Sequence, residues 1–139
     1  MPSDTQTAPA SKKRIWAGRI LSGLPVLFLL FDAIIKLIKT RPVVEAFTNL
    51  GYPPDLAVPI GIVLLVCVAL YVIPQTSVLG AIFLTGYLGG AVATHVRVGD
   101  PLISHVLFPT YVAAVIWGGL FLREDRLRAL LPLRSPRVT

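Results

Sequence analysis

Asp32 and Lys36 lie four residues apart inside the first long apolar stretch of the chain, where other charged side chains are rare. Placing an ionisable side chain in hydrocarbon costs roughly 2.5–3.5 kcal/mol on insertion scales unless the group finds a partner or water. The spacing puts both side chains on one helical face, acid before base, which favours an internal ion pair. Two interpretations follow: a mutually neutralising pair that lets the helix insert into a membrane, or part of a functional polar site.

A second group of residues that could do chemistry lies where the third apolar stretch ends and the fourth begins. Its members are Tyr87, Thr94, His95, Arg97, Asp100 and His105. Imidazoles can relay protons or bind metals near neutral pH. A metal would need further ligands such as Asp32 or Glu45, whose geometry nothing in the sequence defines, and no CxxCH sequence is present for covalent haem. We therefore predict neither a metal nor a haem site.

The composition is that of a membrane protein. The chain has 139 residues, of which 55% are hydrophobic and only 14% charged, and its mean hydropathy is +0.76. A soluble domain carries about 25% charged residues. The net charge of +6 is concentrated near the two ends, which beside apolar runs indicates membrane anchoring rather than nucleic-acid binding. The single cysteine, Cys67, excludes an internal disulfide or a CxxC redox couple.

Four apolar segments, each near the roughly 20 residues needed to cross a bilayer, predict an all-α integral membrane four-helix bundle. They cover residues 15–38, 56–73, 77–96 and 102–122. The turns at 74–77 and 98–101 are short, so the second, third and fourth spans should be antiparallel neighbours. In the longer first outer loop, residues 42–47 predict a short amphipathic helix, with Val43, Val44 and Phe47 on the membrane surface or capping the bundle.

The distribution of basic residues predicts the orientation. Most of the 13 Lys and Arg residues lie near the two ends, and an even number of spans puts both ends on one side, so both termini should be cytoplasmic. Residues 1–11 are then a disordered cytoplasmic tail. Residues 12–125 form the four-span domain, and residues 126–139 form a basic cytoplasmic tail.

The expected topology brings the polar residues to one depth. A rise of about 1.5 Å per residue puts Asp32 and His95 each about 26 Å along their spans from the cytoplasmic side. Lys36, Arg97 and His105 should lie nearby, Glu45 and Asp100 near the mouth, and Tyr87 and Thr94 just below. The sequence therefore predicts one polar pocket that opens outward, and a purely structural polar network is the alternative.

The third span contains several small residues. Gly86 and Gly90 form a GxxxG pattern, which lets helices approach closely. We predict packing within the bundle first and a homodimer contact second.

These features together resemble the DoxX-like family of small four-span bacterial membrane proteins, over about residues 15–123. The resemblance rests on residues 73–76, 79–81 and 85–101, on His105, Phe108 and Pro109, and on Lys36, Pro42, Glu45 and residues 50–53. The family name derives from a subunit linked to quinone-dependent thiosulfate oxidation, and other relatives are tied to redox stress. The resemblance thus implies the bacterial cytoplasmic membrane, a redox association and another membrane or redox subunit as partner.

The resemblance also implies which residues belong to a functional site, namely Lys36, Glu45, Thr94, His95, Arg97, Asp100 and His105. Family members often have Glu near position 64 and a basic residue near 75, where this chain has Leu64 and Gln75, so the resemblance does not by itself imply an enzyme. The leading hypothesis is an outward-facing pocket for a small, partly apolar molecule such as a quinone. The competing hypothesis is a non-catalytic subunit or scaffold.

Overall fold

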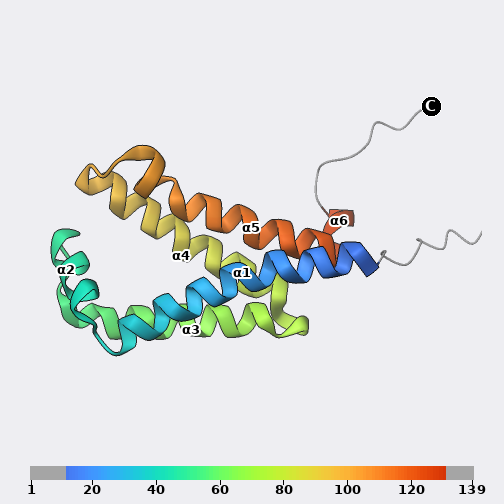
Figure 1. The fold of residues 1–139 in the computed structure, drawn as a ribbon, viewed down its shortest axis with the longest axis horizontal. Coiled ribbons are helices and arrows are strands. Elements are labelled where there is room, and N and C mark those ends of the chain that lie inside the picture. The colour runs from blue at the N-terminus through green and yellow to red at the C-terminus, as the bar shows by residue number, and fades with distance from the viewer. Residues whose placement is uncertain (1–11, 131–139) are drawn as a thin grey trace, which may run out of the picture.

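The computed structural model describes residues 12–130, and all regular structure in that range is helical. Four long helices form a bundle (Figure 1): α1 (Lys12–Leu37), α3 (Ala57–Val72), α4 (Ser77–Val98) and α5 (Phe108–Arg123). The shorter elements are α2 (Arg41–Asn49), η1 (Pro54–Leu56), η2 (Pro74–Thr76), η3 (Leu102–Val106) and α6 (Asp125–Leu130). The predicted tail at 1–11 lies outside the described residues, as does 131–139 of the second tail, whereas residues 126–130 belong to α6.

Four segments are long and apolar enough to cross a membrane: Lys12–Leu37, Pro54–Val72, Pro74–Val98 and Leu102–Arg123. Large apolar side chains such as Leu27, Phe31 and Val66 are exposed along these helices. So extended an apolar surface is rare on a soluble monomer and is expected where lipid tails surround the protein. The predicted fold class, an all-α membrane four-helix bundle, is confirmed.

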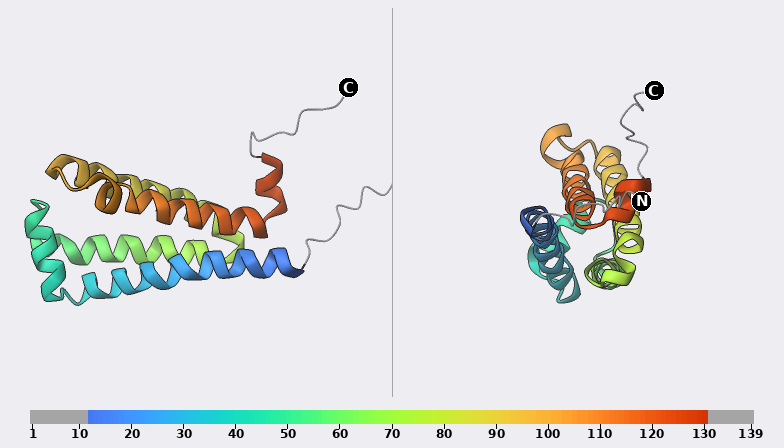
Figure 2. Two further views of the ribbon diagram at one scale, coloured as in Figure 1. Left: turned by 45° about the horizontal axis from the view of Figure 1, so that its top comes forward. Right: turned by 90° about the vertical axis from the view of Figure 1, so that its right-hand side faces the viewer.

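The four long helices form a closed ring, because α1 and α4 each pack against both α3 and α5. The spans α3, α4 and α5 are antiparallel neighbours, as their short connections predict. Figure 2 shows two pairs, α1 with α3 and α4 with α5, which lie close together near the described ends of the chain and diverge toward α2. We call these two ends the terminal end and the α2 end.

Glycines at the terminal end explain why the helices are closest there. A Cβ atom added to Gly119 on α5 would lie 2.8 Å from the backbone nitrogen of Ser22 and 3.0 Å from the carbonyl oxygen of Gly18, both on α1. Gly80 on α4 lies even more tightly against α3, because an added Cβ atom would be 2.3 Å from the backbone nitrogen of Tyr71. A side chain at either glycine would push two helices apart.

The buried Tyr71 hydroxyl ties three helices together. It lies 2.8 Å from Ser22 Oγ on α1 and 2.9 Å from the carbonyl oxygen of Ile116 on α5. Buried hydroxyl groups are costly unless they are hydrogen-bonded, so this arrangement favours one register of α3 against its neighbours.

The prediction that Gly86 and Gly90 pack within the bundle is wrong. A Cβ atom added to either would have no neighbour within 4 Å, and both residues are exposed. The reason is the rotation of α4, which turns the face carrying Ala81, Leu84 and Leu88 into the core. The homodimer alternative stays a prediction.

The fourth span is interrupted near its start. Gly99 ends α4 with a φ of 75°, and the π-helical turn η3 then precedes α5. Pro109 lies in the first turn of α5, where a residue without a backbone N–H is tolerated. His105 is therefore on a separate turn rather than on the long helix.

Candidate functional site

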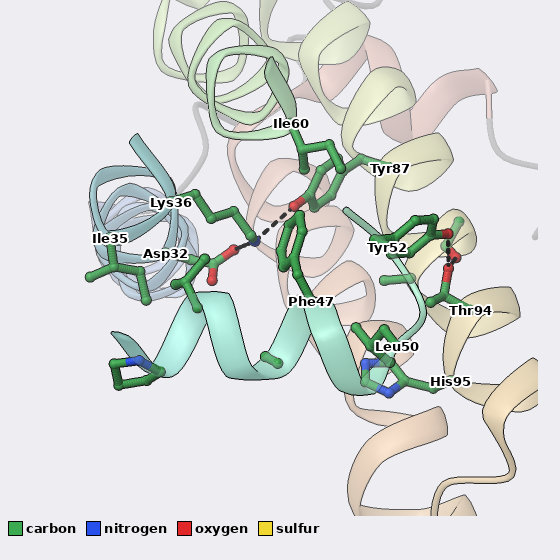
Figure 3. Close-up of a pocket in the computed structure, with 15 residues that line it drawn as sticks. Asp32, Ile35, Lys36, Phe47, Leu50, Tyr52, Ile60, Tyr87, Thr94 and His95 are labelled. Carbon is green, nitrogen blue, oxygen red and sulfur yellow. Dashed lines mark hydrogen bonds and ion pairs between the residues drawn. The ribbon is translucent and has the colours of Figure 1, made fainter. Parts of the chain in front are cut away.

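A cavity of about 540 Å³ lies at the α2 end of the bundle, between α1, α2, α3 and α4 (Figure 3). Its apolar lining residues are Ile35, Pro42, Val43, Ala46, Phe47, Leu50, Ile60, Gly90 and Ala91. Its polar lining residues are Asp32, Lys36, Tyr52, Tyr87, Thr94 and His95. Small-molecule sites usually have about 300–1,000 Å³ and a mainly apolar wall with a few polar groups, and this cavity fits that description.

Lys36 is at the centre of the polar part of the wall. Its ammonium forms an ion pair with Asp32, one turn earlier on α1, and donates a hydrogen bond to the Tyr87 hydroxyl on α4, 3.0 Å away. The side chain of Lys36 is only 13% exposed and that of Asp32 28%. We call Asp32, Lys36 and Tyr87 the Lys36 triad; it joins α1 to α4 across the cavity and carries no net charge.

Close packing of α1 on α3 holds the stem of Lys36. A Cβ atom added to Gly61 on α3 would lie 3.0 Å from Lys36 Cβ and 3.2 Å from the carbonyl oxygen of Ala33. The lysine therefore leaves α1 against α3 and brings its ammonium to the cavity, between Asp32 and Tyr87 (Figure 3).

The predicted amphipathic helix is present as α2 and covers one side of the cavity. Val43 and Phe47, one helical turn apart, are both 6% exposed and pack with Ala57 of α3. Glu45 lies about 200° around the helix from Val43. Its side chain faces away, 65% exposed, and pairs with Arg41 at 3.4 Å.

Three side-chain interactions fasten the segment after α2 to α4. The Tyr52 hydroxyl lies 2.9 Å from Thr94 Oγ1. The guanidinium of Arg97 donates a hydrogen bond to the carbonyl oxygen of Leu50 and lies over the Tyr52 ring, 5.7 Å from its centre. Gly51, with a φ of 79°, makes the sharp turn between them. We call these contacts the Arg97 latch.

The two histidines are neighbours, but only one lines the cavity. His95 Nδ1 lies 2.5 Å from Asp100 Oδ2, and the ring of His95 meets the ring of His105 edge-on, with centres 6.1 Å apart. His105 is exposed on η3, with its Nδ1 2.8 Å from Ser104 Oγ. Within residues 12–130, no group of three or more His, Cys, Asp or Glu side chains is arranged to hold a metal ion.

Five of the predicted pocket residues line the cavity, namely Asp32, Lys36, Tyr87, Thr94 and His95. Arg97, Asp100 and His105 contact residues of the wall from outside, and Glu45 faces away. The prediction assumed that a common depth brings side chains together. Depth does not specify the direction in which a side chain leaves its helix, and these four residues point elsewhere.

Sequence reasoning did not single out Tyr52 or most of the apolar wall. Tyr52 lies in a loop before Pro53, where periodicity indicates no direction. Ile35 and Ile60 are ordinary apolar residues of membrane spans. The amphipathic pattern that includes Phe47 predicts a helix capping the bundle, which is the one sign in the sequence that the wall includes α2.

A four-span helical membrane protein with a mainly apolar cavity at one end is the class that the fold and the site define. The chain belongs to the DoxX-like family, which matches residues 20–119, and the resemblance predicted from the sequence is confirmed. The matched region contains every residue that lines the cavity. Comparison with curated proteins and with solved structures found no match.

Proposed function

We propose that the cavity binds a small, partly apolar molecule such as a quinone, and that the protein serves a redox system of the bacterial cytoplasmic membrane. The observation that carries this proposal is the Lys36 triad, which carries no net charge, set in an apolar cavity of about 540 Å³. Apolar walls favour an apolar body, and the triad can orient one polar head. The redox context rests on the resemblance to DoxX-like subunits.

In this proposal the α2 end faces outward. The start of α1, the end of α5 and α6 lie at the terminal end (Figure 1). These segments carry the basic residues Lys12, Lys13, Arg14, Arg19, Arg123, Arg126 and Arg128. The positive-inside rule assigns such an end to the cytoplasm. The ligand would then reach the cavity from the outer leaflet or the outer face.

Four polar groups of the wall have roles in this proposal. Lys36 and Tyr87 hold the head of the ligand, and Asp32 keeps Lys36 charged. His95, hydrogen-bonded to Asp100, relays a proton between the ligand and the outer surface. Because the only thiol, Cys67, is buried in the core, electrons would pass to or from a partner membrane subunit.

The test is a cavity-filling variant with a neighbouring control. A Cβ atom added to Gly90 or to Gly89 on α4 would meet nothing within 4 Å, but only Gly90 lines the cavity. Lipids and quinones that co-purify with the protein in nanodiscs are extracted and identified, and ultraviolet–visible spectra and metal content are recorded. Gly90→Leu should reduce the retained ligand by roughly threefold or more, and Gly89→Leu should not. Equal retention in both variants, or no enriched apolar molecule in the wild type, contradicts the proposal.

A second candidate function is a non-catalytic subunit or scaffold. One observation favours it: the polar side chains of the wall have intramolecular partners, in the pairs Lys36–Asp32, Tyr52–Thr94 and His95–Asp100. A scaffold needs no ligand. In that case, cells that produce the Gly90→Leu variant should behave as cells with the wild-type protein do.

A further inference from the structure

The Lys36 triad has hydrogen-bonding capacity that the described residues do not use. Tyr87 accepts a hydrogen bond from Lys36, which leaves the Tyr87 O–H proton without an acceptor among residues 12–130. Asp32 contacts Lys36 through Oδ2, which leaves Oδ1 without a donor in the same range. Among residues 12–130, two donors (the Tyr87 O–H and the third N–H of Lys36) and one acceptor (Asp32 Oδ1) therefore remain for a ligand.

The Tyr87 hydroxyl and the Asp32 carboxylate border the same polar part of the cavity wall. Both contact the same Lys36 ammonium, and Figure 3 shows the Asp32 carboxylate and the Tyr87 hydroxyl on either side of it. A hydroxyl group can accept from Tyr87 and donate to Asp32 at once, whereas an ether or carbonyl oxygen can only accept.

The charge of the wall excludes an ionic head. Lys36 is neutralised by Asp32, and no other Lys, Arg, Asp or Glu among the described residues lines the cavity. A carboxylate or phosphate head would have to give up its hydration without meeting an uncompensated cation, which is strongly unfavourable.

We propose that the cavity selects an uncharged amphiphile whose head is a hydroxyl group, that is, a phenol or an alcohol. The hydroxyl oxygen accepts from the Tyr87 O–H, and the hydroxyl proton is donated to Asp32 Oδ1. This inference rests on the proposed function, because it names the ligand class of the same cavity. For a quinone couple, the reduced hydroxyl form satisfies both Tyr87 and Asp32, and the carbonyl form leaves Asp32 Oδ1 without a donor.

The experiment uses the full chain in nanodiscs and a photoreactive 4-alkylphenol with a diazirine on its alkyl chain. Three competitors differ only in the head: 4-nonylphenol, 4-nonylanisole and ionised 4-nonylbenzoate. The phenol should suppress labelling of α2 and α4 at a concentration about three- to tenfold lower than the anisole does. The benzoate should be the weakest competitor.

Variants assign the preference to the triad. Replacing Asp32 and Lys36 together by Leu removes the acceptor without leaving an unpaired charge, so this double variant should lose the preference for the phenol over the anisole. Tyr87→Phe should weaken binding of the phenol and the anisole alike, because both accept from the Tyr87 O–H. The control Tyr111→Phe changes a tyrosine in the shallow groove between α1 and α5 and should preserve that preference. Asp32→Asn leaves the Lys36 charge uncompensated and should move the benzoate ahead of the phenol, in protein that still elutes as a folded species.

The outcomes separate the two proposals. If labelling of α2 and α4 does not exceed labelling around Tyr111, the cavity binds no such amphiphile, and both proposals fail. If α2 and α4 are labelled but all three competitors act equally, or the double variant with Leu at positions 32 and 36 keeps the preference, the inference about the head group is overturned and the binding proposal stands.

Discussion

At the residue scale, Lys36 shows how a charged side chain is accommodated in an apolar bundle. Its ion pair with Asp32 depends only on a spacing of one helical turn, so the sequence predicted it. Its hydrogen bond to Tyr87 on α4 depends on how two helices face each other. Removing one partner of a poorly hydrated ion pair is costlier than replacing both, because the remaining charge has no counter-ion.

We predict that Asp32→Leu destabilises the protein by about 3 kcal/mol, near the lower end of the range for buried pairs because Asp32 is 28% exposed. The double variant Asp32→Leu with Lys36→Leu should be clearly more stable than the single one. Thermal unfolding in one detergent gives the comparison. A double variant as unstable as Asp32→Leu would rule out the ion pair as the cause. A double variant that is folded and fully active would show that Asp32 and Lys36 are not part of the functional site.

At the scale of elements, α2 and the segment after it complete the cavity. Two residues with positive φ flank the helix, Lys39 at 49° and Gly51 at 79°, so the chain changes direction sharply at each end. Val43 and Phe47 attach α2 to α3 through apolar contacts, while the Arg97 latch attaches the following segment to α4. The cavity wall therefore depends on contacts made far from its polar centre.

We predict that Arg97→Gln loosens this wall without unfolding the bundle. The variant loses the bond to the carbonyl oxygen of Leu50 and the contact with the Tyr52 ring, which should cost about 1.5–3 kcal/mol locally. Hydrogen–deuterium exchange of residues 43–52 should then be about tenfold faster or more, with α5 unchanged. Arg41→Gln is the matched control, because Arg41 is on the exposed face of α2. Equal exchange in both variants would show that the latch does not hold α2.

At the scale of the whole molecule, the two ends of the bundle are built differently. Glycine contacts and the Tyr71 hydroxyl hold the helices together at the terminal end. At the α2 end the two helix pairs diverge (Figure 2), and the cavity lies there. Basic residues at the terminal end complete the asymmetry and predict which end faces the cytoplasm.

The orientation has a direct test. A C-terminal alkaline phosphatase fusion should be inactive, because both termini are predicted to be cytoplasmic. A cysteine introduced as Asp55→Cys should react with an impermeant thiol reagent added outside, since the Asp55 side chain is 92% exposed, whereas the buried Cys67 should not. An active phosphatase fusion would show that the topology is the reverse of the predicted one and that the cavity lies on the cytoplasmic side.

The sequence by itself determined the four spans, the short helix between the first two and the Asp32–Lys36 pair. Each depends on local properties: the length of an apolar segment against the thickness of a bilayer, or the positions of residues one turn apart on the same helix. The membership in the DoxX-like family could also be inferred from the sequence, because long stretches of the chain carry the resemblance.

Only the tertiary structure decided which residues meet. The rotation of each helix about its axis depends on close contacts with its neighbours, such as Gly80 against Tyr71 and Gly119 against Ser22. That rotation turns Gly86 away from the core, and the break before α5 leaves His105 outside the cavity wall. The depth of a residue along its helix follows from counting, but its direction follows from packing between segments far apart in the chain.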